Sequence, residues 1–215
     1  MGRIAELLIV LTVLGAVFAL VEWRWPSVQG QRRWRKGIKT DIAWWFWDPF
    51  VNKTVGLVAV VLVVIVMAKV AGVPIDRAHL EAWVRRDTWV TRQPALLQAA
   101  EALVAFDLIG YWSHRAFHEI ETLWRFHAVH HSPTELDWLS SVRVHPVNEI
   151  GQRVAQAVPL VIVGYNPGVL AAYIPLLTLY AIMLHANVDW NFGRLRYVLG
   201  PRSTIAGTTR ASRKV

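Results

Sequence analysis

Long apolar blocks separated by short charged segments constrain this sequence more than any other feature. The first block covers residues 4–21 and is interrupted only by Glu6, Thr12 and Gly15. A helix of that length is about long enough to cross a bilayer core. Further apolar blocks cover residues 55–70, 94–112 and 154–184. Because the apolar residues come in blocks and lack amphipathic spacing, the sequence predicts an all-α integral membrane helical bundle.

A cleaved signal peptide is the alternative interpretation of the first block. The block has no strongly basic start, and it continues into Glu22 and Arg24 without a small-residue cleavage site. Trp23 and Trp25 suit a membrane interface. These features favour a retained membrane span.

The basic segment 29–39 predicts how the spans are oriented. It carries five cations beside a span, and cytoplasmic loops are enriched in Lys and Arg. We therefore expect this segment in the cytoplasm, the aromatic stretch 41–50 at the interface and the block 55–70 crossing outward. The block 94–112 then crosses back and places His114 and the residues after it on the cytoplasmic side, in a multi-pass protein with a cytoplasmic histidine-rich metal site.

The last apolar block is too long and too interrupted for one straight span. Residues 164–168 read GYNPG, and Pro175 follows. Glycine and proline end helices, so we expect two short helices in a re-entrant hairpin that begins and ends on the cytoplasmic side. Residues 135–148, before this block, are predicted to be a polar connection.

Histidines cluster between residues 107 and 148. His114 and His118 lie four apart, so a helix places them on one face. His127, His130 and His131 have i, i+3, i+4 spacing, which predicts a second helical face. The chain has no cysteine, so a metal here needs imidazole or oxygen ligands. Five clustered histidines exceed one tetrahedral site, which favours two metals.

Other charged groups leave alternatives open. Asp107 could accept a hydrogen bond from a ligand imidazole, or it could pair with Arg115 or Arg125. His79 stands alone in a polar loop and is interpreted as solvated or interfacial. The formal charge of +8 does not indicate nucleic acid, because the basic residues flank apolar blocks. The absence of HExxH removes the common zinc-protease interpretation.

Residues 95–200 resemble the fatty acid hydroxylase/sterol desaturase superfamily. The similarity rests on an ordered set of motifs: Asp107, Tyr111–Trp112, HRxxH from His114, LWRFHxxHHS from Leu123, RxHP from Arg143 and HxN from His185. The resemblance implies a membrane oxygenase with a di-iron centre that hydroxylates or desaturates a fatty acid or sterol-like lipid. Such an enzyme uses dioxygen and electrons from a redox partner protein. The implied iron ligands are His114, His118, His127, His130, His131 and His185, with His145 as a further candidate.

The chain departs from the family pattern after Arg202. The family carries a further HxxHH cluster there, whereas residues 203–209 read STIAGTT. Permitted codons for these residues, read in a shifted frame, encode FHHRWHH. We therefore hypothesise a frameshift near Arg202, which would leave the chain as given impaired. A naturally divergent tail is the alternative.

The sequence thus predicts three regions. Residues 1–93 form N-terminal spans and a basic loop, residues 94–202 form the hydroxylase-like domain, and residues 203–215 form a divergent or out-of-frame tail. The rival functions are a non-catalytic or degenerate membrane metal-binding protein, a metal transporter and a structural membrane protein. A transporter would need ionisable residues spaced through its spans, whereas these histidines gather near one surface.

Overall fold

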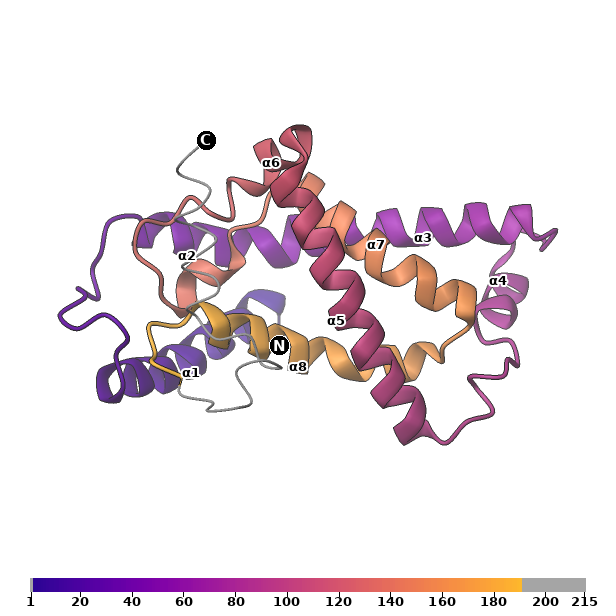
Figure 1. Cartoon of the computed structure of the whole chain (residues 1–215), viewed down its shortest axis with the longest axis horizontal. Helices are drawn as coiled ribbons and strands as arrows, with labels where there is room; N and C mark the ends of the chain where they lie inside the picture. Colours follow the sequence, from indigo (N-terminus) through magenta and orange to yellow (C-terminus); the bar gives the residue numbers. More distant parts are fainter. Residues whose placement is uncertain (1, 191–215) are drawn as a thin grey trace. The chain divides into compact units, whose positions relative to one another are not determined.

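A computed structural model describes residues 2–190 as a set of helices (Figure 1). No β-strand forms among these residues, which contain only an isolated bridge between Pro26 and Val188. In chain order the elements are α1 (Arg3–Arg24), α2 (Ile38–Trp47), the π-helical turn η1 (Asp48–Asn52), α3 (Lys53–Val70), α4 (Arg77–Val84), α5 (Ala95–Glu119), α6 (Glu121–His127), the 3₁₀ helix η2 (Trp138–Val142), α7 (Pro146–Val163) and α8 (Pro167–His185). The all-α prediction is confirmed for the described residues.

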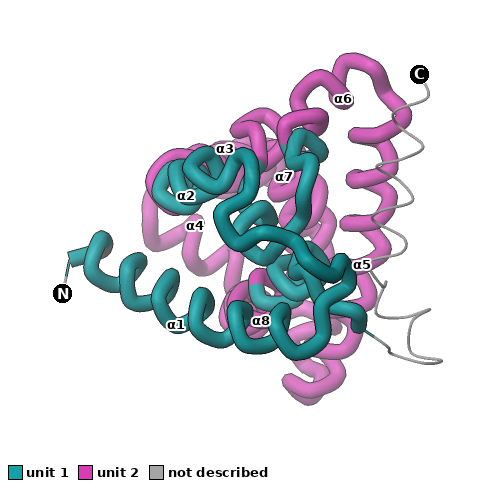
Figure 2. The backbone as a smooth tube through the Cα atoms, turned by 90° about the vertical axis from the view of Figure 1, so that its left-hand side faces the viewer, with its two compact units in different colours: residues 1–48, 130–143, 179–215 teal, residues 49–129, 144–178 magenta. Residues whose placement is uncertain are grey.

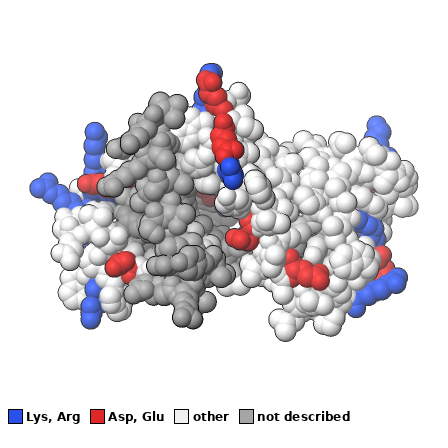
Figure 3. Space-filling model, viewed as in Figure 1, with Lys and Arg blue, Asp and Glu red and all other residues white. Residues whose placement is uncertain are grey.

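Four helical segments are long and apolar enough to cross a membrane. They are Ile4–Arg24, Ile38–Val70, Ala95–Glu119 and Pro167–His185. In the space-filling view, charged side chains gather in a few groups, and broad uncharged surface lies between them (Figure 3). The three blocks predicted as spans before residue 120 are therefore confirmed as candidate spans. Their orientation, with a cytoplasmic histidine site, stays a prediction.

The aromatic stretch 41–50 lies within a helix that continues into the second span. Helix α2 passes through η1 into α3 without a break, so the helical segment is longer than residues 55–70. Pro49 lies within η1. Proline has no N–H for the regular i→i−4 bond, and a π-helical turn is one way to accommodate that loss.

The last apolar block forms two helices, as predicted, but their limits differ. Gly164 ends α7 in the left-handed conformation with φ of 85°, which glycine adopts without strain. Helix α7 begins earlier than expected because His145 caps it and Pro146 occupies its first turn. The break expected at Pro175 is wrong, since α8 continues through it as a candidate span. Proline is tolerated in apolar spanning helices more readily than in soluble ones.

The described residues group into two compact units, coloured separately in Figure 2. Unit 1 comprises residues 2–48, 130–143 and 179–190, and unit 2 comprises residues 49–129 and 144–178. Each unit therefore combines segments that are distant in sequence. The histidines are divided between them.

Unit 1 has an aromatic core around Trp138. Its indole stacks on Phe18 at 5.9 Å between ring centroids and meets the edge of Trp45 at 5.4 Å. The Trp45 indole N–H donates to the Leu139 carbonyl at 3.0 Å. Helix η2 is thus buried against α1 and α2, and the expected polar connection over residues 135–148 is corrected to a packed segment.

Four buried charges in unit 1 form a network beside this core. Arg35 pairs with Asp41 at 2.6 Å and with both carboxylate oxygens of Asp137. Arg143 pairs with Asp41 from the other side and donates to the Gly37 carbonyl at 3.0 Å. Burial alone would lower the pKa of Arg35, but the hydrogen bond and charge of Asp137, together with Asp41, raise it. Because each charge has opposite partners, the network is tolerated inside the unit.

Gly37 is expected to resist substitution because of this network. Its φ is 89°, and a Cβ there would lie 2.8 Å from an Arg143 guanidinium nitrogen. We expect Gly37→Ala to lower the free energy of unfolding by about 2 kcal/mol, combining backbone strain with displacement of a buried charge. Thermal unfolding in detergent measures this. Gly30→Ala is the matched control, since its φ is also positive but its Cβ would meet nothing within 4 Å. Equal shifts in both variants would contradict the role of Arg143.

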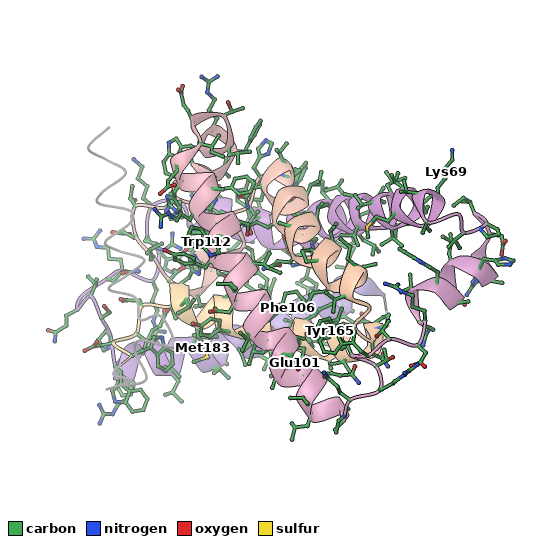
Figure 4. All side chains as sticks on the ribbon, turned by 45° about the vertical axis from the view of Figure 1, so that its right-hand side comes forward. Lys69, Glu101, Phe106, Trp112, Tyr165 and Met183 are labelled. Carbon is green, nitrogen blue, oxygen red and sulfur yellow. The ribbon has the colours of Figure 1, made fainter. Side chains whose placement is uncertain are left out.

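Unit 2 packs α5 against α7 and the turn that follows α7. Its buried core contains Val90, Ala102, Leu160 and Tyr165. The Tyr165 hydroxyl donates to Glu101 at 3.3 Å, and Figure 4 shows both residues near Phe106. Burial, and then the Glu101 carboxylate, raise the pKa of Tyr165. The charge of Glu101, which lies within a candidate span, is therefore partnered.

Candidate metal centre

Three histidines of unit 2 converge on one point. His114 and His118 lie on one face of α5, with their Nε2 atoms 3.0 Å apart, as the four-residue spacing predicts. Only Ile120 separates α5 from α6, so the chain turns back at once and brings His127 within 3.3 Å of His118, Nε2 to Nε2. The candidate ligand nitrogens of these three residues all lie within 4.8 Å of one another.

His127 is held in one orientation by a buried amide. The residue is only 1% exposed, and its Nδ1 lies 2.9 Å from the Oδ1 of Asn148 on α7. An amide oxygen accepts, so Nδ1 carries the proton and the Nε2 lone pair faces the other imidazoles. A metal-binding histidine is usually oriented in this way, by an oxygen acceptor on its other nitrogen.

The second predicted helical face is corrected by the structure. Helix α6 ends at His127, and residues 128–131 form a turn, so His130 and His131 are not on a helix with His127. Pro133 has no N–H to donate to residue 129, and it disfavours helical backbone at Ser132. The chain leaves the helix one turn before that point. His130 and His131 consequently belong to unit 1.

Two histidines of unit 1 face each other in the same manner. His130 and His185 have Nε2 atoms 3.2 Å apart. The Nδ1 of His130 lies 3.2 Å from the Arg143 carbonyl, and that of His185 lies 2.7 Å from the Ala181 carbonyl. A carbonyl can only accept, so both Nδ1 atoms carry protons and both Nε2 atoms present lone pairs.

His131 packs beside this pair. Its ring meets the edge of the His130 ring at 5.2 Å between centroids. His131 follows His130 directly in the turn, four residues after His127 in sequence. The structure thus places it next to a candidate ligand, and its own role as a ligand stays a prediction.

These nitrogen positions fit a metal. Two lone pairs 3.2 Å apart repel each other unless a proton or a metal ion lies between them. Two imidazoles on one metal, each at about 2.1 Å, have nitrogens separated by about 3.0 Å at a right angle and about 3.4 Å at a tetrahedral angle. The observed separations of 3.0, 3.3 and 3.2 Å lie in this range. Imidazole nitrogens suit iron, zinc, copper and nickel.

His145 has a different environment. Its Nδ1 accepts a hydrogen bond from the Val147 backbone N–H at 3.1 Å and caps α7, while its ring lies against Phe126. An accepting Nδ1 in a neutral imidazole leaves the proton on Nε2, which then has no lone pair for a metal. His145 stays a predicted ligand, but its contacts here are those of a capping residue.

Neither alternative for Asp107 is found among the described residues. Its side chain is exposed, and Arg115 and Arg125 pair with Glu119 and Glu121 on their own helices. His79 is exposed and bonds to Asp76, which confirms its interpretation as a solvated residue.

Sequence reasoning missed Asn148 as the partner of an imidazole. The only signal was its place three residues after His145 in the first turn of a helix. Such a position is usually solvated, and only the packing of α7 against α5 and α6 buries it. The backbone carbonyls of Arg143 and Ala181 have no sequence signal at all.

The chain is 33% identical over 113 residues to the ornithine lipid hydroxylase OlsE of Rhizobium tropici, which covers 50% of this chain and 32% of that protein. It is 28% identical over 102 residues to the alkylglycerol monooxygenase of Danio rerio, covering 47% of this chain and 22% of that protein. The chain therefore spans a third or less of the length of these relatives, and no solved structure matches it. The family model for fatty acid hydroxylase matches residues 99–210, just over half of the chain, and the protein therefore belongs to the fatty acid hydroxylase family.

Proposed function

We propose that this protein is a membrane-bound, non-haem di-iron lipid hydroxylase. The observation that carries the proposal is the common orientation of His127, His130 and His185. Each has its Nδ1 on an oxygen acceptor and its Nε2 facing another imidazole. Five clustered histidines between residues 114 and 131 exceed the ligands of one tetrahedral site, which supports two metal positions.

The residues of each unit would hold one iron ion. His114, His118 and His127 are proposed for one, and His130 and His185 for the other, with His131 and His145 as further candidates. When bound, the iron pair would supply the redox chemistry that activates dioxygen, using electrons from a redox partner protein. One oxygen atom enters a C–H bond of the lipid, and two electrons and two protons convert the other to water.

The chain's own groups have defined tasks in this proposal. Asn148 and the carbonyls of Arg143 and Ala181 keep a proton on each Nδ1, so that Nε2 stays available to the metal. The apolar surfaces of α7 and α8 are proposed to line the path of the lipid tail. The names of both relatives describe hydroxylation or mono-oxygenation of lipids, which favours hydroxylation over desaturation.

The basic segment 29–39 supports a cytoplasmic location of the site. Electron-donating proteins would then reach it from that side. Cysteine labelling tests the orientation, because the chain has no native cysteine. A single cysteine placed at exposed Lys36 should react in intact cells only with a membrane-permeant reagent. Reaction with an impermeant reagent would reverse the assignment.

The predicted frameshift after Arg202 lies outside the described residues. The family match extends to residue 210, and we propose that a further histidine cluster belongs in this region. Independent sequencing of the codons for residues 195–215 tests the hypothesis. A new gene sequence that encodes HxxHH after Arg202 supports the frameshift hypothesis and a complete enzyme. Codons that encode no HxxHH in any frame support the divergent tail.

Metal analysis of the purified protein tests the proposed function. We expect iron above background, together with hydroxylated lipid when dioxygen and a reductant are supplied. Bound metal without product, even in a chain with a restored cluster, would favour the degenerate metal-binding alternative. An absence of any transition metal would exclude both functions.

Asn148→Ala is expected to weaken metal binding by about 10- to 100-fold, because His127 loses the acceptor that orients it. Competition with a chelator of known affinity measures this. Asn166→Ala is the control, since Asn166 is exposed and accepts only from the Gly168 N–H. Unchanged affinity in Asn148→Ala would show that the amide does not position the ligand.

A further inference from the structure

A cavity in unit 1 lies beside the end of the first candidate span. Its volume is about 520 Å³, within the range of small-molecule sites. It is lined by the last turns of α1, the loop that follows, helix η2 and Asn187. None of the histidines lines it, so it is distinct from the candidate metal centre.

The loop that forms one wall is fixed by hydrogen bonds. Asn187 accepts from the Val28 N–H at 2.9 Å and donates to the Val28 carbonyl at 3.1 Å. Gln31 donates to the Leu136 carbonyl at 3.0 Å. The cavity is thus held open by ordered contacts, and a ligand would enter a largely preformed site.

The charges in the cavity are not balanced. Asp137 is paired with Arg35, and Glu22, which accepts from the neutral backbone N–H groups of Trp138 and Asn187, supplies one negative charge against two arginines. Arg32 and Arg33 also line the cavity, and neither has a hydrogen bond or ion pair within residues 2–190. Two guanidinium groups are therefore available to an anion. Arginine binds planar or tetrahedral oxyanions with paired N–H groups.

Most of the remaining lining is apolar, and it carries exposed indoles. Trp23 and Trp34 are 70% and 80% exposed, although they lie beside a candidate membrane span. Exposed tryptophan is typical of the membrane–water interface, where one end of the ring is apolar and the other is hydrated. A ligand here would be amphipathic, with an anionic part toward the arginines and an apolar part toward the indoles.

We propose that this cavity binds the headgroup of a lipid that carries an oxyanion, either a phosphate or a carboxylate. The proposal rests on the proposed function only in taking the ligand to be a membrane lipid. Arg32 and Arg33 contact the oxyanion, and Trp23 and Trp34 contact the glycerol or first acyl carbons. The site recognises the polar end of the lipid, which places it outside the region where a C–H bond is oxidised.

The competing explanation is that the arginines serve only to orient the protein in the membrane. The same basic segment offers a matched control, because Lys36 and Lys39 are exposed but do not line the cavity. Arg32→Gln with Arg33→Gln and Lys36→Gln with Lys39→Gln remove equal charge from one segment. Arg32→Lys with Arg33→Lys keeps the charge and removes the guanidinium fork.

The test is a binding titration of the purified full chain in neutral detergent, with bound lipid counted by native mass spectrometry. The probes are dioleoylphosphatidylglycerol, uncharged dioleoylglycerol and soluble glycerol 3-phosphate. We expect the anionic lipid to bind most tightly. Its affinity should fall about tenfold in the Arg32/Arg33 glutamine variant and less than about twofold in the Lys36/Lys39 variant.

Other outcomes overturn the proposal. Equal losses in the two glutamine variants would indicate general attraction to the basic segment. Tight binding of dioleoylglycerol would show that the site does not recognise an oxyanion. Binding of glycerol 3-phosphate as tight as that of the anionic lipid would identify a soluble phosphoester as the ligand. The titration requires neither iron nor turnover, so its result is independent of the hydroxylase assay.

Discussion

His130→Ala is expected to abolish product formation and to lower bound metal from about two equivalents per chain to about one. The His130 Nε2 faces that of His185 at 3.2 Å, and one imidazole from this pair would not hold iron against dissociation. Metal content by mass spectrometry and oxidised lipid by chromatography are the two measurements. Both are measured on the reading frame that the gene supports, because the chain as given has no histidine after Arg202.

His79→Ala is the matched control for this experiment. His79 is exposed, bonds only to Asp76 at the start of α4, and lies on no ligand face. We expect its replacement to change neither metal content nor product. His127→Ala should remove the equivalent held in unit 2 and leave the one held by His130 and His185. Retention of both equivalents and of product in His130→Ala would refute the ligand assignment.

Asp41→Asn is expected to lower the free energy of unfolding by about 3–5 kcal/mol. The substitution keeps the side-chain volume but removes the carboxylate that Arg35 and Arg143 share in a buried position. Two buried guanidinium groups would then have only Asp137 as a charged partner. We expect a large decrease in the thermal unfolding midpoint in detergent.

Metal binding provides a second measurement for the same variant. Because the Arg143 carbonyl holds the Nδ1 of His130, disturbance of the network should also weaken metal retention in unit 1. Glu121→Gln is the control, since the Arg125–Glu121 pair is exposed and such pairs contribute about 0–1 kcal/mol. Equal stability losses in the two variants would mean that burial does not control the effect.

The pH dependence of this network follows from the raised pKa of Arg35. A cation whose pKa is higher in the folded state contributes its full stabilisation below its ordinary pKa, and the contribution is lost only as pH rises through the folded value. For arginine that range is strongly alkaline. We therefore expect no loss of stability from Arg35 at any pH used in an enzyme assay.

The predictable parts of this molecule are those encoded by local sequence. Apolar length predicted the spans, and four-residue spacing placed His114 and His118 on one face of α5. Gly164 ends α7 because glycine adopts the left-handed backbone conformation without strain, and this is a property of the residue itself. In each case the decisive information lies within a few residues of the position concerned.

The other parts depend on packing between distant segments. The spacing of His127, His130 and His131 suits a helix, but the chain ends α6 at His127 and gives His130 a carbonyl from Arg143 instead. Arg35 belongs to the basic segment 29–39 and Asp137 to the predicted polar connection, yet they pair with each other inside unit 1 across 102 residues of sequence. No periodicity within one segment can reveal a partner that far away.

The single-residue link between α5 and α6 determines the order in which the clustered histidines can meet. His118 and His127 are nine residues apart, so they can meet once this helical hairpin has been synthesised. His130 and His185 are separated by 55 residues and cannot meet before α8 has been made. Closing a short loop costs less entropy and occurs sooner than closing a long one. The growing chain therefore brings together His114, His118 and His127 before α8, and with it His185, has been synthesised.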